Sequence, residues 1–164
     1  GGFTLVRCGK KPDVIALPSP SELYAAVIHP KIELKTSDSR SVLKQKILLE
    51  KAIQQWGNLA ALVSGLYTED YDLIGRGLID VIVEPSRSAL IPGFNALKKA
   101  ANDAGSLGSG ISGSGPSVFA LCKGKDIAEK ASLAMAKALG EYAIEFDTYC
   151  SKINTQGIKI LSEK

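Results

Sequence analysis

Residues 106–121 read SLGSGISGSGPSVFAL, and the neighbouring elements can be worked out from this stretch. Its first part is mostly glycine and serine, whereas 118–122 is an apolar run typical of a buried strand. Upstream, residues 95–104 are predicted to form a helix that ends at Gly105, since glycine is the usual residue after a helix C-terminus. The order is therefore helix, glycine loop, strand.

The segment GSGISG at 108–113 matches the pattern G-x-G-x-x-G, but a dinucleotide-binding fingerprint must follow a strand and open a helix. This segment does neither, and it lacks the lysine of a P-loop. Glycines still permit positive φ, so that consecutive N–H groups can form a concave nest for an anion, and serine hydroxyls add donors. The candidate loop residues are Gly110, Ser112, Gly113, Ser114 and Gly115. A mobile surface loop is the alternative.

The remaining sequence predicts further strands and helices around this core segment. Strands are expected at 3–8 and 14–17, which form a hairpin, and at 25–34, 144–149 and 157–161; helices are expected at 37–44, 49–67, 68–78 and 126–139; residues 84–94 are expected to form a loop. This mixture predicts an α+β fold with a mostly antiparallel sheet and helices packed on one face. Without repeats or long linkers, residues 1–164 are expected to form one domain.

The helix predicted at 49–67 has two apolar stripes. Leu49, Ile53, Trp56 and Tyr67 lie on one stripe, and Leu62 and Leu66 are on the stripe beside it. A helix that is apolar on two faces is expected to pack against two neighbours and to be central in the fold.

Composition excludes several classes of function. The formal net charge is only +3 and aromatic residues make up 6%, which argues against nucleic-acid binding. No apolar run is long enough for a membrane span. Three cysteines and one histidine form neither a disulfide framework nor a zinc cluster, which favours a reducing compartment, the cytoplasm. Cys8 and Cys122 lie in strand-like runs and are expected to be buried.

Two arginines lie among small residues, Arg40 in KTSDSR and Arg87 in EPSRS. The planar guanidinium suits carboxylate or phosphate recognition, and Thr36 shares a helix face with Arg40 if the helix starts there. The alternative is a surface ion pair with Asp38 or Glu84. No catalytic constellation is evident, because the lone histidine, beside a proline in a predicted strand, has no clear partners.

Three segments together carry a resemblance to a known family. GISGSGPSVFAL at 110–121 resembles the third sequence motif of the GHMP kinases, in the form found in homoserine kinases. KTSDSRSVL at 35–43 and EPSRSALIPGF at 84–94 are similar to further segments of that family, in the same order. The resemblance begins at Gly1 and reaches at least Cys122.

The resemblance implies a ferredoxin-like carboxy-terminal domain of an enzyme that transfers the γ-phosphate of Mg-ATP to the hydroxyl of L-homoserine, a step toward threonine. It implies that Arg40 and Arg87, with Thr36 nearby, bind the substrate carboxylate, and that the glycine loop lies against the active site and the phosphate-binding loop of the other half. The family's phosphate loop, P-x-x-x-G-L-G-S-S-A, and its acidic Mg²⁺ residues do not occur in this sequence. The chain is therefore expected to hold neither catalytic nor metal-binding residues, and to be inactive alone.

The expected partners are L-homoserine and the family's own amino-terminal ATP-binding domain, with a homodimer as a further option; neither nucleic acid nor membrane is expected. Three alternatives remain. The chain could be a regulatory amino-acid-binding α+β module, the corresponding domain of another GHMP small-molecule kinase, or a structural or RNA-binding ferredoxin-like domain. The last lacks strand-borne aromatic residues for base stacking, since Phe119 is alone on its strand.

Overall fold

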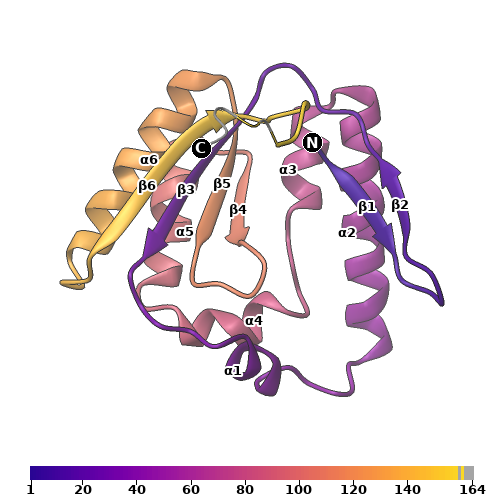
Figure 1. The fold of residues 1–164 in the computed structure, drawn as a ribbon, viewed down its shortest axis with the longest axis horizontal. Coiled ribbons are helices and arrows are strands. Elements are labelled where there is room, and N and C mark those ends of the chain that lie inside the picture. The colour runs from indigo at the N-terminus through magenta and orange to yellow at the C-terminus, as the bar shows by residue number, and fades with distance from the viewer. Residues whose placement is uncertain (159, 161–164) are drawn as a thin grey trace.

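The computed structural model describes residues 1–158 and 160, and its centre is a four-stranded antiparallel sheet with the order β4-β5-β3-β6 (Figure 1). The strands are β3 (Leu23–Pro30), β4 (Gly108–Ile111), β5 (Val118–Lys123) and β6 (Phe146–Lys152). In the register, Ala26 of β3 lies opposite Ala120 of β5 and Cys150 of β6. The α+β class and the antiparallel sheet are confirmed.

Helices α5 (Phe94–Asp103) and α6 (Lys125–Gly140) cover one face of this sheet, where the main core forms. Strand residues alternate between the two faces, so every second side chain of β3 and β5 points toward these helices. Those strand residues are Ala26, Ile28, Val118, Ala120 and Cys122, and the fully buried helix residues against them include Leu97, Ala101, Ala128, Ala131, Met135 and Leu139.

A smaller cluster lies on the opposite side, where α2 (Leu49–Thr68) and α3 (Tyr71–Gly77) approach the sheet. Leu66 of α2 and Ile74 of α3 pack with Leu23 and Leu121. The two helices pack closely at Gly65, where a Cβ atom would lie 2.8 Å from the backbone nitrogen of Ile74. Glycine is therefore needed at this crossing.

The prediction that α2 is central is wrong for this chain. One stripe of the helix packs against α3, but the other is exposed: Leu49 is 68% exposed, Ile53 56%, Trp56 62% and Tyr67 62%. We call these four residues the α2 stripe. The second neighbour that the pattern requires is absent from the described part of the chain.

The predicted hairpin is confirmed as β1 (Thr4–Arg7) and β2 (Asp13–Ala16), which form a separate two-stranded sheet. Val6 is 50% exposed and Val14 64%, so the hairpin buries little apolar surface. Cys8 follows β1 and is exposed, against the prediction, because the hairpin to which it belongs is itself mostly exposed. Cys122 is buried as predicted.

Several predicted boundaries change. The segment 84–94 is not only a loop: it contains α4 (Glu84–Arg87) and the 3₁₀ helix η1 (Ser88–Leu90). The Asp80 carboxylate explains this start, because it accepts hydrogen bonds from the backbone N–H groups of Ile82, Val83 and Glu84. The helix predicted at 37–44 is the shorter α1 (Thr36–Ser41).

Two of the predicted strands also differ from those in the structure. Strand β3 stops at Pro30, rather than continuing to residue 34, and the hydrogen bond from Lys31 N–H to Glu145 O ends the pairing. Residues 157, 158 and 160 are not in a strand, and the rest of the strand predicted at 157–161 lies outside the described residues.

Candidate functional site

Three segments far apart in sequence meet below the sheet: α1, α4 and the glycine loop between β4 and β5. The Nε–H of Arg87 donates to the carbonyl oxygen of Ser39 at 3.0 Å, and Nη1 donates to the carbonyl oxygen of Gly113 at 2.9 Å. The hydroxyl of Ser39 donates to the carbonyl oxygen of Ser114 at 2.9 Å. The structure therefore brings one predicted arginine into direct contact with the predicted loop.

The glycine loop is held in a defined conformation. Gly113 has φ of +61° and Gly115 has φ of +85°, the left-handed region that glycine adopts without strain. The N–H of Gly115 donates to Ser112 O at 3.0 Å, and the N–H of Ser112 donates to Ser117 O at 2.8 Å. Positive φ is thus confirmed at two predicted positions, and the mobile-loop alternative is disfavoured by these bonds.

Gly110 has a different place from the one predicted, because it lies within β4 rather than in the loop. Pairing with β5 places Gly110 opposite Phe119, and a Cβ atom there would come within 3.3 Å of a Glu84 carboxylate oxygen. An edge strand with the sequence GSGI has no alternating apolar pattern of its own, so its pairing with β5 determines it.

Arg40 and Thr36 are both on the exposed side of α1. Within residues 1–158 and 160, no hydrogen bond or ion pair involves the Arg40 side chain. The ion pairs that were the alternative for both arginines do not form: Glu84 pairs with Lys98 instead, and Asp38 accepts a hydrogen bond from Ser37. The guanidinium of Arg40 is therefore free to bind an anion.

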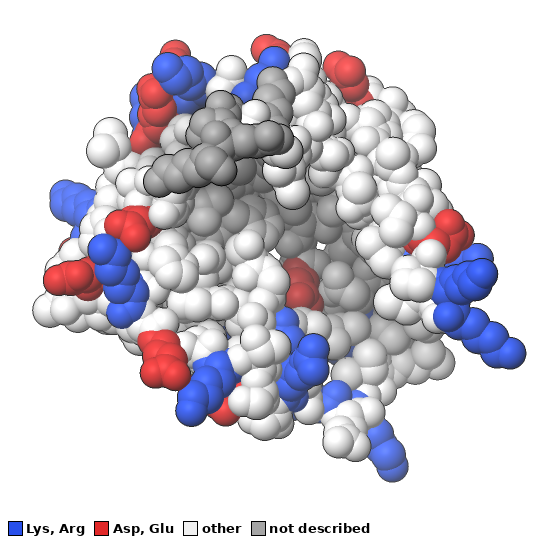
Figure 2. All heavy atoms as spheres, in the orientation of Figure 1, with Lys and Arg blue, Asp and Glu red and all other residues white. Residues whose placement is uncertain are grey.

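A hollow lies at the centre of the molecular surface, and basic side chains gather along its lower rim, over the region of α1 and α4 (Figure 2). Arg40 belongs to α1 and Arg87 to α4. A rim that carries positive charge beside a glycine loop attracts an anionic group, since both the guanidinium and backbone N–H groups are donors.

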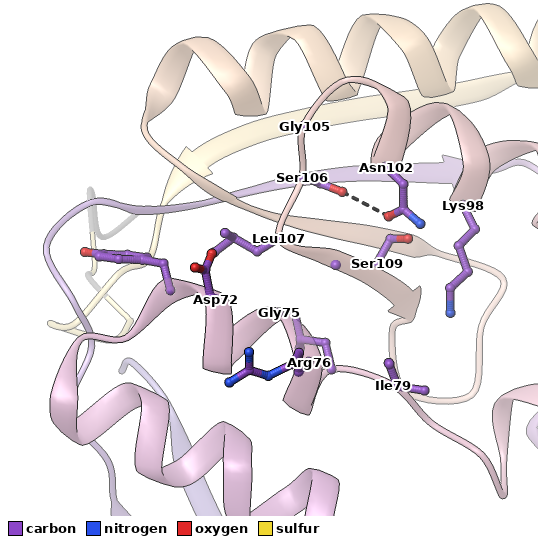
Figure 3. Close-up of a pocket in the computed structure, with 13 residues that line it drawn as sticks. Asp72, Gly75, Arg76, Ile79, Lys98, Asn102, Gly105, Ser106, Leu107 and Ser109 are labelled. Carbon is purple, nitrogen blue, oxygen red and sulfur yellow. Dashed lines mark hydrogen bonds between the residues drawn. The ribbon is translucent and has the colours of Figure 1, made fainter.

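A cavity of about 630 Å³ lies elsewhere, between α3, α5 and the outer edge of β4 (Figure 3). Its polar lining includes Arg76, Lys98, Asn102 and Ser109. The Ser109 hydroxyl is buried and has no hydrogen-bond partner among the described residues. Sequence patterns do not indicate this cavity, because its walls come from three separate elements without a shared motif.

The single histidine is not part of a Ser-His-Asp triad in the described part of the chain. His29 Nδ1 and Ser117 Oγ lie 2.8 Å apart, but Asp147, opposite His29 in the sheet, pairs with Lys31. Burial raises the pKa of the Cys122 thiol to about 11, with a smaller contribution from Cys150, so it stays protonated and unreactive at neutral pH.

Neither a metal site nor a membrane span is found in residues 1–158 and 160. No three His, Cys, Asp or Glu side chains come together there as ligands. None of the helices described is both long and apolar enough to cross a membrane.

Comparison with known proteins gives a consistent result. The family model "GHMP kinases C terminal" matches residues 58–141, about half of the chain. A homoserine kinase from Chlorobaculum tepidum is 49% identical over 99% of this chain and 51% of its own length, and one from Chlorobium phaeobacteroides (strain DSM 266) is 50% identical over 98% and 51%. The chain thus spans about half the length of the curated relatives it matches.

Solved structures agree. The crystal structure of homoserine kinase from Cytophaga hutchinsonii superimposes with a TM-score of 0.94 at 52% identity, over 96% of this chain and 50% of that one. Leishmania major mevalonate kinase has a TM-score of 0.67 at 16% identity, over 93% and 50%, which shows a shared fold alone. The chain belongs to the GHMP kinase family and corresponds to the carboxy-terminal domain of its members.

Proposed function

We propose that this chain is the substrate-binding half of a homoserine kinase, which transfers the γ-phosphate of ATP to the hydroxyl of L-homoserine and yields O-phospho-L-homoserine. The observation that carries the proposal is the junction of α1, α4 and the glycine loop, where Arg87 contacts the loop and Arg40 is unpaired. The similarity to homoserine kinases over nearly the whole chain supports it. The free thiols of Cys8, Cys122 and Cys150 are compatible with the cytoplasm.

In this proposal the two arginines bind the carboxylate of homoserine. A guanidinium has five N–H donors, and Arg87 uses two of them for backbone carbonyls, which leaves donors on Nη1 and Nη2 for the substrate. Arg40 can offer a complete bidentate fork. The Thr36 hydroxyl, in the first turn of α1, adds a neutral donor for the same ligand.

ATP and Mg²⁺ would be bound mainly by the amino-terminal half. The described residues contain no cluster of acidic side chains that fits a Mg²⁺ ion. This half contributes substrate orientation and, through the glycine loop, backbone N–H groups at the edge of the site. Phosphoryl transfer depends on positioning and on stabilisation of charge around the phosphates.

We further propose that the amino-terminal half covers the α2 stripe and the β1–β2 hairpin. An exposed apolar helix face marks a contact surface, and an isolated two-stranded hairpin is marginally stable in water. The curated relatives contain about as much chain again as this sequence. The missing neighbour of α2 is therefore assigned to that half, with a second copy of this chain as the alternative.

The α2 stripe gives a first test. Trp56→Ser in the full-length protein is expected to lower the free energy of unfolding by about 3–5 kcal/mol, the usual cost of truncating a buried tryptophan. Leu133→Ser is the control, because Leu133 is 73% exposed on the distant helix α6. Urea denaturation compares the two; equal, small losses would show that Trp56 stays exposed. Sedimentation velocity then tests whether a second copy of this chain covers the α2 stripe instead. In that case the wild type is a dimer, and Trp56→Ser dissociates it.

The glycine loop gives a second test. Gly113→Val in the full-length protein is expected to destabilise it by about 1–3 kcal/mol through backbone strain, and to lower turnover before it unfolds the domain. A Cβ at Gly113 meets nothing within 4 Å, so the strain comes from φ alone. At Gly115 the Cβ would also lie 3.1 Å from Ile91 Cδ1, so Gly115→Val should cost more.

Gly140→Val is the matched control, because Gly140 is the last residue of α6, with open space around it and without a positive φ. Urea denaturation and a kinase assay follow all three variants. If Gly113→Val behaves like Gly140→Val in both measurements, the loop conformation does not matter for function.

A coupled assay of ADP release by the full-length protein tests the proposed function. Turnover with L-homoserine and Mg-ATP, with none on R-mevalonate or phosphomevalonate, is the expected result. Turnover on one of the other two would identify another GHMP small-molecule kinase. Binding of homoserine without any turnover would instead favour the regulatory amino-acid-binding module.

A further inference from the structure

One residue at the junction has no assigned role in the proposed function. Ser39 is fully buried, although the rest of the short helix α1 around it is exposed. It is one of two buried polar side chains in the described part of the chain, and unlike Ser109 it is hydrogen-bonded. A buried hydroxyl with a single, well-formed bond fixes the groups it joins, because breaking that bond leaves both of them unpaired.

Ser39 takes part in a closed set of contacts. Its hydroxyl donates to Ser114 O, its own carbonyl accepts from Arg87 Nε–H, and Arg87 Nη1 donates to Gly113 O. The residues joined are 75, 48 and 26 positions apart in sequence. Each of the three segments is thus bonded to both of the others, so a shift of one segment strains its bonds to both.

These bonds determine which groups face the substrate. In a trans peptide the C=O and N–H point in opposite directions, so an arginine bonded to Gly113 O turns the N–H of Ser114 away from itself. The plane of the Arg87 guanidinium is fixed at two points, at Ser39 O and Gly113 O. The directions of its remaining N–H groups on Nη1 and Nη2 are consequently fixed, and they depend on the position of the loop.

We propose that Ser39 is a positioning residue for the amino-acid substrate: its hydroxyl anchors the Ser114 peptide and so keeps the loop and Arg87 in the arrangement that receives the carboxylate. This inference rests on the proposed function. Ser39 does not touch the substrate, since its side chain is enclosed between α1 and the loop.

Kinetics of the full-length protein test this role with Ser39→Ala. The KM for L-homoserine should rise about tenfold, whereas kcat and the KM for ATP stay within twofold of wild type. With L-homoserine amide, which lacks the carboxylate, the variant should match the wild type. Ser41→Ala is the control, because its hydroxyl bonds only to Asp38 O within the same helix. Ser39→Cys, which keeps a weak donor at the same position, is used if alanine impairs folding.

The outcomes of these kinetics distinguish the role of Ser39 from the proposed function. An unchanged KM for homoserine in Ser39→Ala, in an enzyme whose wild type is active, would overturn this role and leave the proposed function intact. Equal losses with homoserine and its amide, or an equal rise in the KM for ATP, would show a merely structural role. A wild type without activity on homoserine would contradict the proposed function and this role with it.

Discussion

Arg40→Ala in the full-length protein is expected to lower kcat/KM for L-homoserine by about 10–150-fold, because each charged hydrogen bond lost costs roughly 1.5–3 kcal/mol. The KM for ATP should change little, since Arg40 lies on the exposed side of α1 with no contact to the glycine loop among the described hydrogen bonds and ion pairs. Steady-state kinetics with each substrate varied in turn measure both effects.

Arg87→Ala should lower kcat/KM for L-homoserine by a factor in the same range, and it should also lower kcat. Its side chain binds Ser39 O and Gly113 O as well as the proposed carboxylate, so its removal frees the loop. Arg40→Lys and Arg87→Lys should rescue poorly, because lysine lacks the planar fork. Lys99→Ala is a suitable control, since Lys99 pairs only with Asp103 on the exposed side of α5. Homoserine kinetics that stay at wild-type values in both alanine variants would refute the arginine clamp.

The 164-residue chain by itself is expected to release no ADP above background with Mg-ATP and homoserine. ATP binding should be negligible, because the sequence holds neither the family's phosphate loop nor its acidic metal ligands. Homoserine should bind with a Kd in the millimolar range or weaker, which corresponds to a binding free energy of about −4 kcal/mol. The reason is that one wall of the pocket is missing and polar groups stay solvated.

A coupled ADP-release assay and isothermal titration with homoserine check these two expectations. The control is the full-length protein at the same concentration of active sites. Turnover by the chain alone in the range of about 1–100 s⁻¹, which is usual for kinases, would show that this half contains the machinery assigned to the other half.

Much of the fold could be predicted because its signals are local. A continuous apolar run identified β5, glycine identified the end of α5, and the density of glycine predicted positive φ at Gly113 and Gly115. The edge strand β4 could not be predicted, since its residues GSGI have no pattern until β5 pairs with them. The start of α4 depends on Asp80 accepting three backbone N–H bonds, a contact that composition does not reveal.

The candidate site was predictable only in its parts. Arginines among small residues and a glycine loop each indicate an anion site, and the family resemblance placed them in one pocket. Ser39 links these parts of the site. It is a small polar residue in a short helix, and no sequence periodicity distinguishes it from the exposed Ser37 and Ser41. The pattern of α2 predicted two neighbours, but only α3 packs against it in the described part of the chain, and the second is a proposal.

A crystal structure of the full-length protein with L-homoserine bound tests the central claim most directly. The account predicts the substrate carboxylate within about 2.7–3.2 Å of the Arg40 guanidinium and of the free nitrogen of Arg87, beside Gly113 and Ser114. The side-chain hydroxyl of homoserine should point away from the arginines, toward the amino-terminal half. A carboxylate bound instead in the cavity of Arg76 and Lys98, or by the amino-terminal half alone, would contradict it.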